Sequence, residues 1–110
     1  MIEYELYHLD RENRKSGQYL KFLHPEFKEF GQSGKVYRKE DLPKKFIDSS
    51  EYEIMEFMFQ DLSIESRLCT YVLHNKTANK VSHRSSVWIR HGDDWKLLFH
   101  QGTSTADKNL

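Results

Sequence analysis

The chain has 110 residues, of which 17 are basic and 17 are acidic, so its formal net charge is zero, and 14% of its residues are aromatic. A chain of this length predicts one domain with one hydrophobic core, and the aromatic content argues against disorder. The balanced charge provides no attraction to nucleic acid or to an anionic membrane, so we expect neither as a partner.

Features that report on the cellular compartment predict a cytoplasmic protein. The single Cys69 cannot form an internal disulfide, and its apolar neighbours predict an inert, buried thiol. No apolar run approaches the roughly 18 residues that a membrane span requires. The first residues carry acidic side chains and lack the apolar segment of a signal peptide.

The N-terminal region predicts a helix followed by a charged segment. Residues 2–9 have the spacing of a short amphipathic helix, with Ile2, Leu6 and Leu9 on one face. Residues 11–15 are almost entirely charged and predict a connection or a polar helical turn.

A second helix, a short hairpin and a third helix are expected next. The second helix covers residues 17–23, because Pro25 disfavours helical geometry in the residue before it. Strands at 26–30 and 35–38 flank a Gly-rich turn, and residues 39–47 predict the third helix.

The remaining chain predicts four long strands. Residues 51–60 are ambiguous, because their Met and Glu content also allows a helix, but their shortness and lack of caps favour a strand. Strands are expected at 67–75 and in both arms of a hairpin at 81–103. Its turn is His91-Gly92-Asp93-Asp94, since Gly and Asp accept tight-turn geometry. Residues 104–110 predict a flexible tail.

Both faces of this hairpin carry apolar side chains. Strict alternation puts Arg84, Ser86 and Trp88 on one face of the first arm, and it puts Leu97 and His100 on opposite faces of the second. In antiparallel sheets with one solvent-exposed face, apolar and polar residues alternate along each strand. We therefore expect one face to pack on helices and the other on a second subunit or a cavity. Helices gathered beside a run of strands predict the α+β class.

Two stretches resemble a known superfamily. LHPEFKEFGQSGKVYRKEDL and RSSVWIRHGDDWKLLFHQGT, matching from Leu23 to Asp41 and from His83 to Thr103, resemble the nuclear transport factor 2-like superfamily. The His-Pro-Glu-Phe strand, the Ser-Gly turn and the terminal His-Gln-Gly-Thr are most similar to an uncharacterised, SnoaL-like bacterial branch of it.

The resemblance implies a cone-shaped, curved antiparallel sheet of about six strands, with two or three N-terminal helices packed on its concave face. It implies a single domain over residues 1–103 and a homodimer formed through the outer sheet face. Relatives include isomerases, dehydratases, cyclases and association domains, so function does not follow from the fold. The catalytic base and oxyanion-hole pair of the ketosteroid isomerases do not align onto this chain.

Glu29 and His100 are the candidate proton carriers. Glu29, on the first predicted strand, becomes a useful base if burial raises its pKa toward neutrality. Arg84 either binds an anionic ligand or pairs with Glu29, which would make Glu29 a weaker base. The alternatives are a structural ion pair for Glu29 and a core or interface position for His100.

Further ligand contacts are predicted from polar and aromatic residues on the strands, namely Tyr37, Arg84, Ser86, Trp88 and Gln101. Because strand neighbours point to opposite faces, His100 and Gln101 cannot both line one pocket without a bulge. No metal site or cofactor is expected, since the six histidines form no HExxH motif and the chain has no CxxC.

Three functions remain open. The first is a homodimeric domain that holds a small organic molecule in a partly apolar cone. The second is a cofactor-independent isomerase, dehydratase or hydrolase that uses Glu29 or His100 as a general acid or base. The third is a pure dimerisation or association module. A cavity enclosing Glu29, Arg84 and a histidine favours the first two, and a cone filled with side chains favours the third.

Overall fold

The structure is a computed structural model that describes residues 1–43 and 50–105. In this part of the chain the helices are α1 (Ile2–Leu9), α2 (Arg11–Ser16) and the 3₁₀ helices η1 (Gln18–Phe22) and η2 (Lys39–Asp41). The strands are β1 (Leu23–Phe30), β2 (Val36–Arg38), β3 (Tyr52–Ser63), β4 (Ser66–Asn75), β5 (Lys80–His91) and β6 (Asp94–Ser104).

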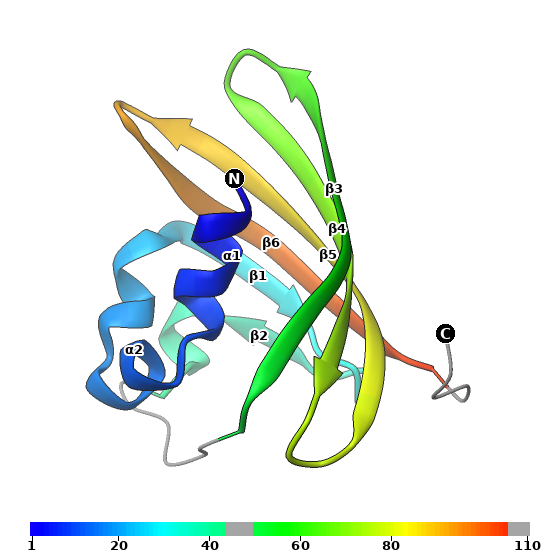
Figure 1. The fold of residues 1–110 in the computed structure, drawn as a ribbon. Coiled ribbons are helices and arrows are strands. Elements are labelled where there is room, and N and C mark those ends of the chain that lie inside the picture. Colours follow the sequence, from blue (N-terminus) through cyan, green and yellow to red (C-terminus); the bar gives the residue numbers. More distant parts are fainter. Residues whose placement is uncertain (44–49, 106–110) are drawn as a thin grey trace.

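The described strands form one open, twisted sheet in the order β2-β1-β6-β5-β4-β3. Figure 1 shows the helices gathered on one face of this sheet, which is called the inner face below. The predicted α+β class with helices over a curved sheet is confirmed. The sheet is mixed rather than wholly antiparallel, because β1 runs parallel to β6. These two strands are far apart in the chain, so no tight turn forces them to be antiparallel.

Helix α1 is confirmed, but a different face of it is buried. Its buried residues are Glu5, His8 and Leu9, whereas Ile2 and Leu6 are 38% and 49% exposed. Positions 5, 8 and 9 form as regular a helical face as positions 2, 6 and 9. The expectation that Ile2 and Leu6 share the packing face with Leu9 is therefore wrong.

The other predicted helices are replaced by shorter turns. The segment 17–23 contains the 3₁₀ helix η1 in place of the predicted α-helix. It is separate from α2 because Gly17, with a φ of 87°, ends α2 in a left-handed conformation. The helix predicted at 39–47 begins as η2, but Leu42 is already extended with a ψ of 141°. Pro43 follows it and favours this geometry. Residues 44–49 of this prediction lie outside the described residues.

The predicted strands are confirmed with small changes at their ends. Residues 51–60, the ambiguous segment, form most of β3, and the hairpin at 81–103 forms β5 and β6. β1 begins at Leu23, earlier than expected, and Ser104 belongs to β6. Residues 106–110 of the predicted tail lie outside the described residues.

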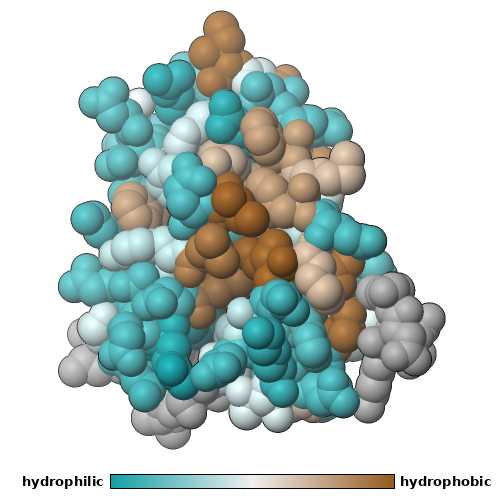
Figure 2. All heavy atoms as spheres, in the orientation of Figure 1, coloured by the Kyte–Doolittle hydropathy of each residue, from teal (hydrophilic) through white to brown (hydrophobic). Residues whose placement is uncertain are grey.

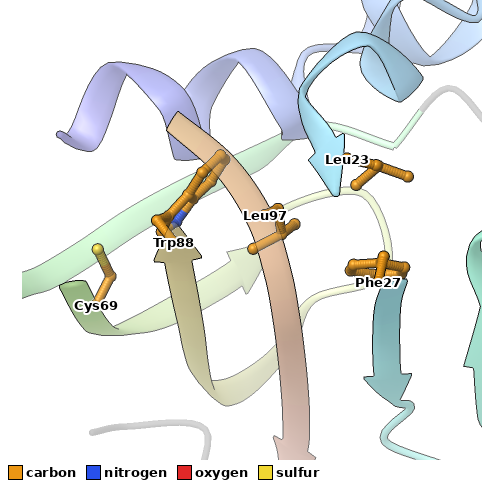
Figure 3. Packing of buried hydrophobic residues seen from close by; sticks show 5 residues of the cluster. All are labelled: Leu23, Phe27, Cys69, Trp88 and Leu97. Atoms are coloured by element: carbon orange, nitrogen blue, oxygen red, sulfur yellow. The ribbon is translucent and has the colours of Figure 1, made fainter. Parts of the chain in front are cut away.

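The hydrophobic core lies between the helices and the inner face of the sheet. Its central cluster, shown in Figure 3, consists of residues that are each at most 2% exposed, namely Leu23, Phe27, Cys69, Trp88 and Leu97. Burial raises the pKa of the Cys69 thiol to about 12, so the buried, inert thiol that the sequence predicts is present.

A bulge in β6 decides which side chains share the inner face. The register between β5 and β6 shifts, so that Trp88 pairs with Leu97 while Ser86 pairs with His100. Strict alternation puts Leu97 and His100 on opposite faces. The extra residue in the bulge, Leu98, turns both of them to the inner face.

Exposed apolar side chains lie on two surfaces outside the core. On the outer face of the sheet they include Phe30, Val36 and Met58, and the homodimer through this face stays a prediction. Figure 2 shows a second apolar area over the region between α1 and β3. In α1 itself, the apolar side chains of Ile2 and Leu6 are exposed. Within the described residues, no helix is long and apolar enough to cross a membrane.

Candidate functional site

Four side chains that the sequence singles out lie in one row across four strands. Cα pairings join Tyr37 of β2 to Glu29 of β1, Glu29 to His100 of β6, and His100 to Ser86 of β5. Paired residues project from the same face of a sheet. Arg84 lies two residues from Ser86 on β5, so it projects from the inner face as well.

A cavity of about 560 Å³ adjoins this row on the inner face. Its wall includes four of the predicted residues, Tyr37, Glu29, Arg84 and His100, together with His8 of α1. A volume of this size suits a small organic ligand. In residues 1–43 and 50–105, no three His, Cys, Asp or Glu side chains are grouped so that they could hold a metal ion.

The remaining predicted contacts lie away from this cavity. Gln101 is the strand neighbour of His100, so it projects from the outer face, where it lines a more open hollow of about 810 Å³. Trp88 packs in the core and is fully buried. Ser86 is also fully buried and meets the cavity only through its hydrogen bond to His100.

The Arg84 guanidinium lies over β6 and binds neutral groups. Its Nε, Nη1 and Nη2 atoms donate hydrogen bonds to Ser82 Oγ (2.9 Å), His100 Nε2 (3.3 Å) and Gln32 Oε1 (3.4 Å). No carboxylate of the described residues forms an ion pair with it. The positive charge at the cavity wall is therefore not neutralised by direct contact with a described acidic residue.

Gly102 provides the space that the guanidinium occupies. It is the Cα partner of Arg84 across β5 and β6. A Cβ atom at position 102 would lie 2.8 Å from Cζ and 2.9 Å from Nε of Arg84. The glycine of the terminal His-Gln-Gly-Thr thus lets a neighbouring side chain cross the backbone at close range.

Hydrogen bonds fix the tautomer of His100. A guanidinium can only donate, so Nε2 of His100 accepts from Arg84 and the ring proton lies on Nδ1. Nδ1 then donates to Ser86 Oγ at 2.7 Å. Burial, followed by the charge of Arg84, holds the pKa of His100 well below its usual range, so the ring is neutral.

A buried carboxylate, Glu5 of α1, is linked to the site by hydrogen bonds and was not foreseen from the sequence. Its Oε1 accepts from the Tyr71 hydroxyl at 2.9 Å, and its Oε2 accepts from Trp88 Nε1 at 2.7 Å. Burial raises the pKa of Glu5, while hydrogen bonds from Trp88, Tyr71 and Ser86 oppose this rise. Glu5 thereby ties α1 to β4 and β5, and through Ser86 to His100.

His8 lines the cavity, and its Nδ1 atom is buried without a hydrogen-bond partner in the described residues. Its ring centroid lies 5.9 Å from that of Tyr19 and 6.2 Å from that of His100. Burial, followed by the charges of Arg14 and Arg84, lowers the pKa of His8 to about 3. A buried polar atom without a partner costs about 1–3 kcal/mol.

Glu29 reaches the same cavity from β1 and is half-buried. Within residues 1–43 and 50–105, its carboxylate has neither a hydrogen bond nor an ion pair. Burial raises the pKa of Glu29, and the charges of Arg84 and Arg14 lower it to a smaller extent. Its role as a proton carrier, like that of His100, stays a prediction.

The two buried, neutral histidines predict that stability falls as the pH is lowered. In the unfolded chain each binds a proton near pH 6.5, whereas folded His8 does so only near pH 3. Below pH 6.5 the unfolded state therefore binds more protons, which favours unfolding. Glu5 and Glu29 act in the opposite sense, because their raised pKa values make the folded state bind protons first.

Replacing one of these histidines isolates its share of this effect. Between pH 6 and pH 5, we expect the free energy of unfolding to fall by about 1 kcal/mol less in His8→Gln than in the wild type. Denaturant titrations at both pH values measure the difference. His83→Gln, which replaces an exposed histidine, serves as the control. Equal falls in His8→Gln and the wild type would show that His8 is not buried in neutral form.

No family model matches the chain, and no curated protein matches its sequence. Solved structures do match over nearly its whole length. An NTF2-like protein from Cytophaga hutchinsonii superimposes with a TM-score of 0.75 and 13% identity, covering 94% of both chains. A putative Ca/calmodulin-dependent kinase II association domain from Exiguobacterium sibiricum has a TM-score of 0.76 and 12% identity, covering 96% of this chain and 89% of that one.

A third similar structure carries a different description. A putative ketosteroid isomerase from Parabacteroides distasonis has a TM-score of 0.68 and 15% identity, covering 96% of this chain and 85% of that one. The architecture is thus shared by proteins that are described as an association domain and as an isomerase. At these identities the likeness establishes the architecture, and function has to be argued from the cavity.

Proposed function

We propose that this protein, which has the nuclear transport factor 2-like fold, binds a small organic molecule with an anionic group in its inner-face cavity. Arg84 is the ionic partner of that group. The observation that carries the proposal is the environment of the Arg84 guanidinium, which lies at the cavity wall with neutral hydrogen-bond partners.

A guanidinium in this position favours an anion for two reasons. Hydrogen bonds between charged partners are stronger than neutral ones, and the partly enclosed cavity reduces competition from water. Arg84 also has five N–H donors, of which three are used by Ser82, His100 and Gln32, so donors remain for a ligand. Hence a carboxylate is a good match for the free part of the guanidinium.

The composition of the wall supports an organic ligand rather than an inorganic ion. Tyr37, Leu42, Tyr52 and Leu73 line the cavity beside the charged groups. Sites for small organic molecules combine such apolar walls with a few polar groups that fix orientation. His8 also lines the cavity and adds a polar ring to its wall. An association module alone would have no use for this arrangement, so ligand binding is favoured over it.

Matched carboxylate and amide ligands test the proposal. By NMR titration we expect 3-phenylpropanoate to bind wild-type protein at least about tenfold more tightly than 3-phenylpropanamide, because only the former forms charge-assisted hydrogen bonds. Arg84→Gln should remove this preference. Arg90→Gln, which replaces an exposed arginine on the same strand, should keep it. The proposal fails if wild type shows no preference, or if Arg84→Gln retains it.

A further inference from the structure

We infer that the ligand is a zwitterion, specifically an amino acid with an apolar side chain, which presents its carboxylate to Arg84 and its ammonium group to Glu29. This inference rests on the proposed function, because it names the ligand class for the same cavity. It is carried by the placement of two opposite charges that line one cavity without contacting each other.

The two charged groups flank the His100 ring. Glu29 is the Cα partner of His100 on the neighbouring strand, and Arg84 Nη1 donates to His100 Nε2 at 3.3 Å. Opposite charges that are partly withdrawn from water are expected to pair unless other contacts keep them apart. Ser82, His100 and Gln32 hold the guanidinium by hydrogen bonds, and no ion pair to Glu29 forms.

A ligand with a single charge satisfies only half of this arrangement. A simple carboxylate binds Arg84 favourably but is repelled by the carboxylate of Glu29. A simple amine matches Glu29 but meets the positive charges of Arg84 and Arg14, which also lines the cavity. An amino acid, in which one carbon separates the two charged groups, presents the complementary charge to each side.

Two other features of the cavity suit the same ligand class. His8 is neutral, and its unpartnered Nδ1 can accept a hydrogen bond from an ammonium group that also donates to Glu29. Leu42, Tyr52 and Leu73 provide an apolar wall for the side chain of an amino acid.

Two sets of matched compounds test the inference by isothermal titration of the full chain. The first is phenylalanine, 3-phenylpropanoate and 2-phenylethylamine, and the second is leucine, 4-methylpentanoate and 3-methylbutylamine. Within at least one set we expect the amino acid to bind at least about fivefold more tightly than either singly charged analogue, since each charge-assisted hydrogen bond adds to affinity.

Variants assign each charge to its partner. Glu29→Gln should abolish the advantage of the amino acid over the carboxylate without weakening the carboxylate. Arg84→Gln should abolish the advantage over the amine. Glu26→Gln, which replaces an exposed glutamate on the same strand, should change neither ratio.

The failures of the two proposals are distinguishable. If the carboxylates bind through Arg84 but the amino acids bind no more tightly, the zwitterion inference is wrong and the proposed function stands. If the amino-acid advantage persists in Glu29→Gln, the assignment of the ammonium group to Glu29 is wrong. If none of the compounds binds the wild-type protein, both proposals are overturned.

Discussion

Replacing Glu5 by alanine is expected to lower the free energy of unfolding by about 2–4 kcal/mol, one of the largest stability losses that a single substitution in α1 can cause. The variant leaves the Trp88 indole N–H and the Tyr71 hydroxyl buried without their acceptor. It also leaves a cavity at a position that is fully withdrawn from water. Denaturant-induced unfolding of the variant and the wild type measures the loss.

Two control variants separate the hydrogen bonds from the helix itself. In Glu5→Gln, the amide oxygen can accept from Trp88 and the amide nitrogen can donate to the oxygen of Tyr71, so we expect a loss of only about 1 kcal/mol. Glu3→Ala removes an exposed acid from the same helix and should cost less than about 1 kcal/mol. If Glu5→Ala is no less stable than Glu3→Ala, the buried carboxylate does not hold α1 in place.

Replacing Gly102 by alanine is expected to weaken binding of 3-phenylpropanoate by about tenfold or more, although no ionisable group is removed. The added Cβ would lie 2.8 Å from Arg84 Cζ, so the guanidinium has to leave its position. Gly102 is not among the glycines with positive φ, so alanine adopts its backbone conformation without strain. The displaced guanidinium leaves the buried Nε2 of His100 without its donor, so we expect the free energy of unfolding to fall by about 1–3 kcal/mol. Titration and unfolding experiments measure the two effects separately.

A double-mutant cycle shows whether Gly102 acts through Arg84. Combined with Arg84→Gln, Gly102→Ala should add no further weakening of the residual affinity, because the side chain that it displaces is already absent. Equal weakening by Gly102→Ala in both backgrounds would show that the glycine affects binding by another route.

The strands were predictable because their signals are local. Alternating side chains and the turn at Gly92 define β5 and β6, and aromatic residues favour strands. The ambiguous β3 is also a strand, in keeping with its lack of caps. The parallel pairing of β1 with β6 was not predictable, because nothing in either segment specifies a partner more than sixty residues away.

The burial of α1 shows where sequence patterns fail. An apolar stripe at Ile2, Leu6 and Leu9 competes with a stripe that contains Glu5, His8 and Leu9. The second is buried because Glu5 meets donors on Tyr71 and Trp88, which lie 66 and 83 residues further along the chain. No local pattern reports such distant partners, so hydrophobicity alone selected the wrong face.

The sequence predicted only those residues of the candidate site that belong to strands. Glu29, Tyr37, Arg84 and His100 belong to strands, and strand alternation together with register places them in one cavity. His8 was missed because it depends on the orientation of α1. His100 lies on the same face as the core because of the bulge at Leu98. The sequence does not indicate this bulge, so the face of His100 could not be predicted.

The histidine ring signals in an NMR titration with 3-phenylpropanoate test most directly whether the inner-face cavity is the binding site. Of the six histidines, His8 and His100 line this cavity and His83 lines the hollow on the outer face. We predict that the signals of His8 and His100 shift together to saturation with one dissociation constant while that of His83 stays in place. A saturating shift of His83 with His8 and His100 unchanged would contradict the account.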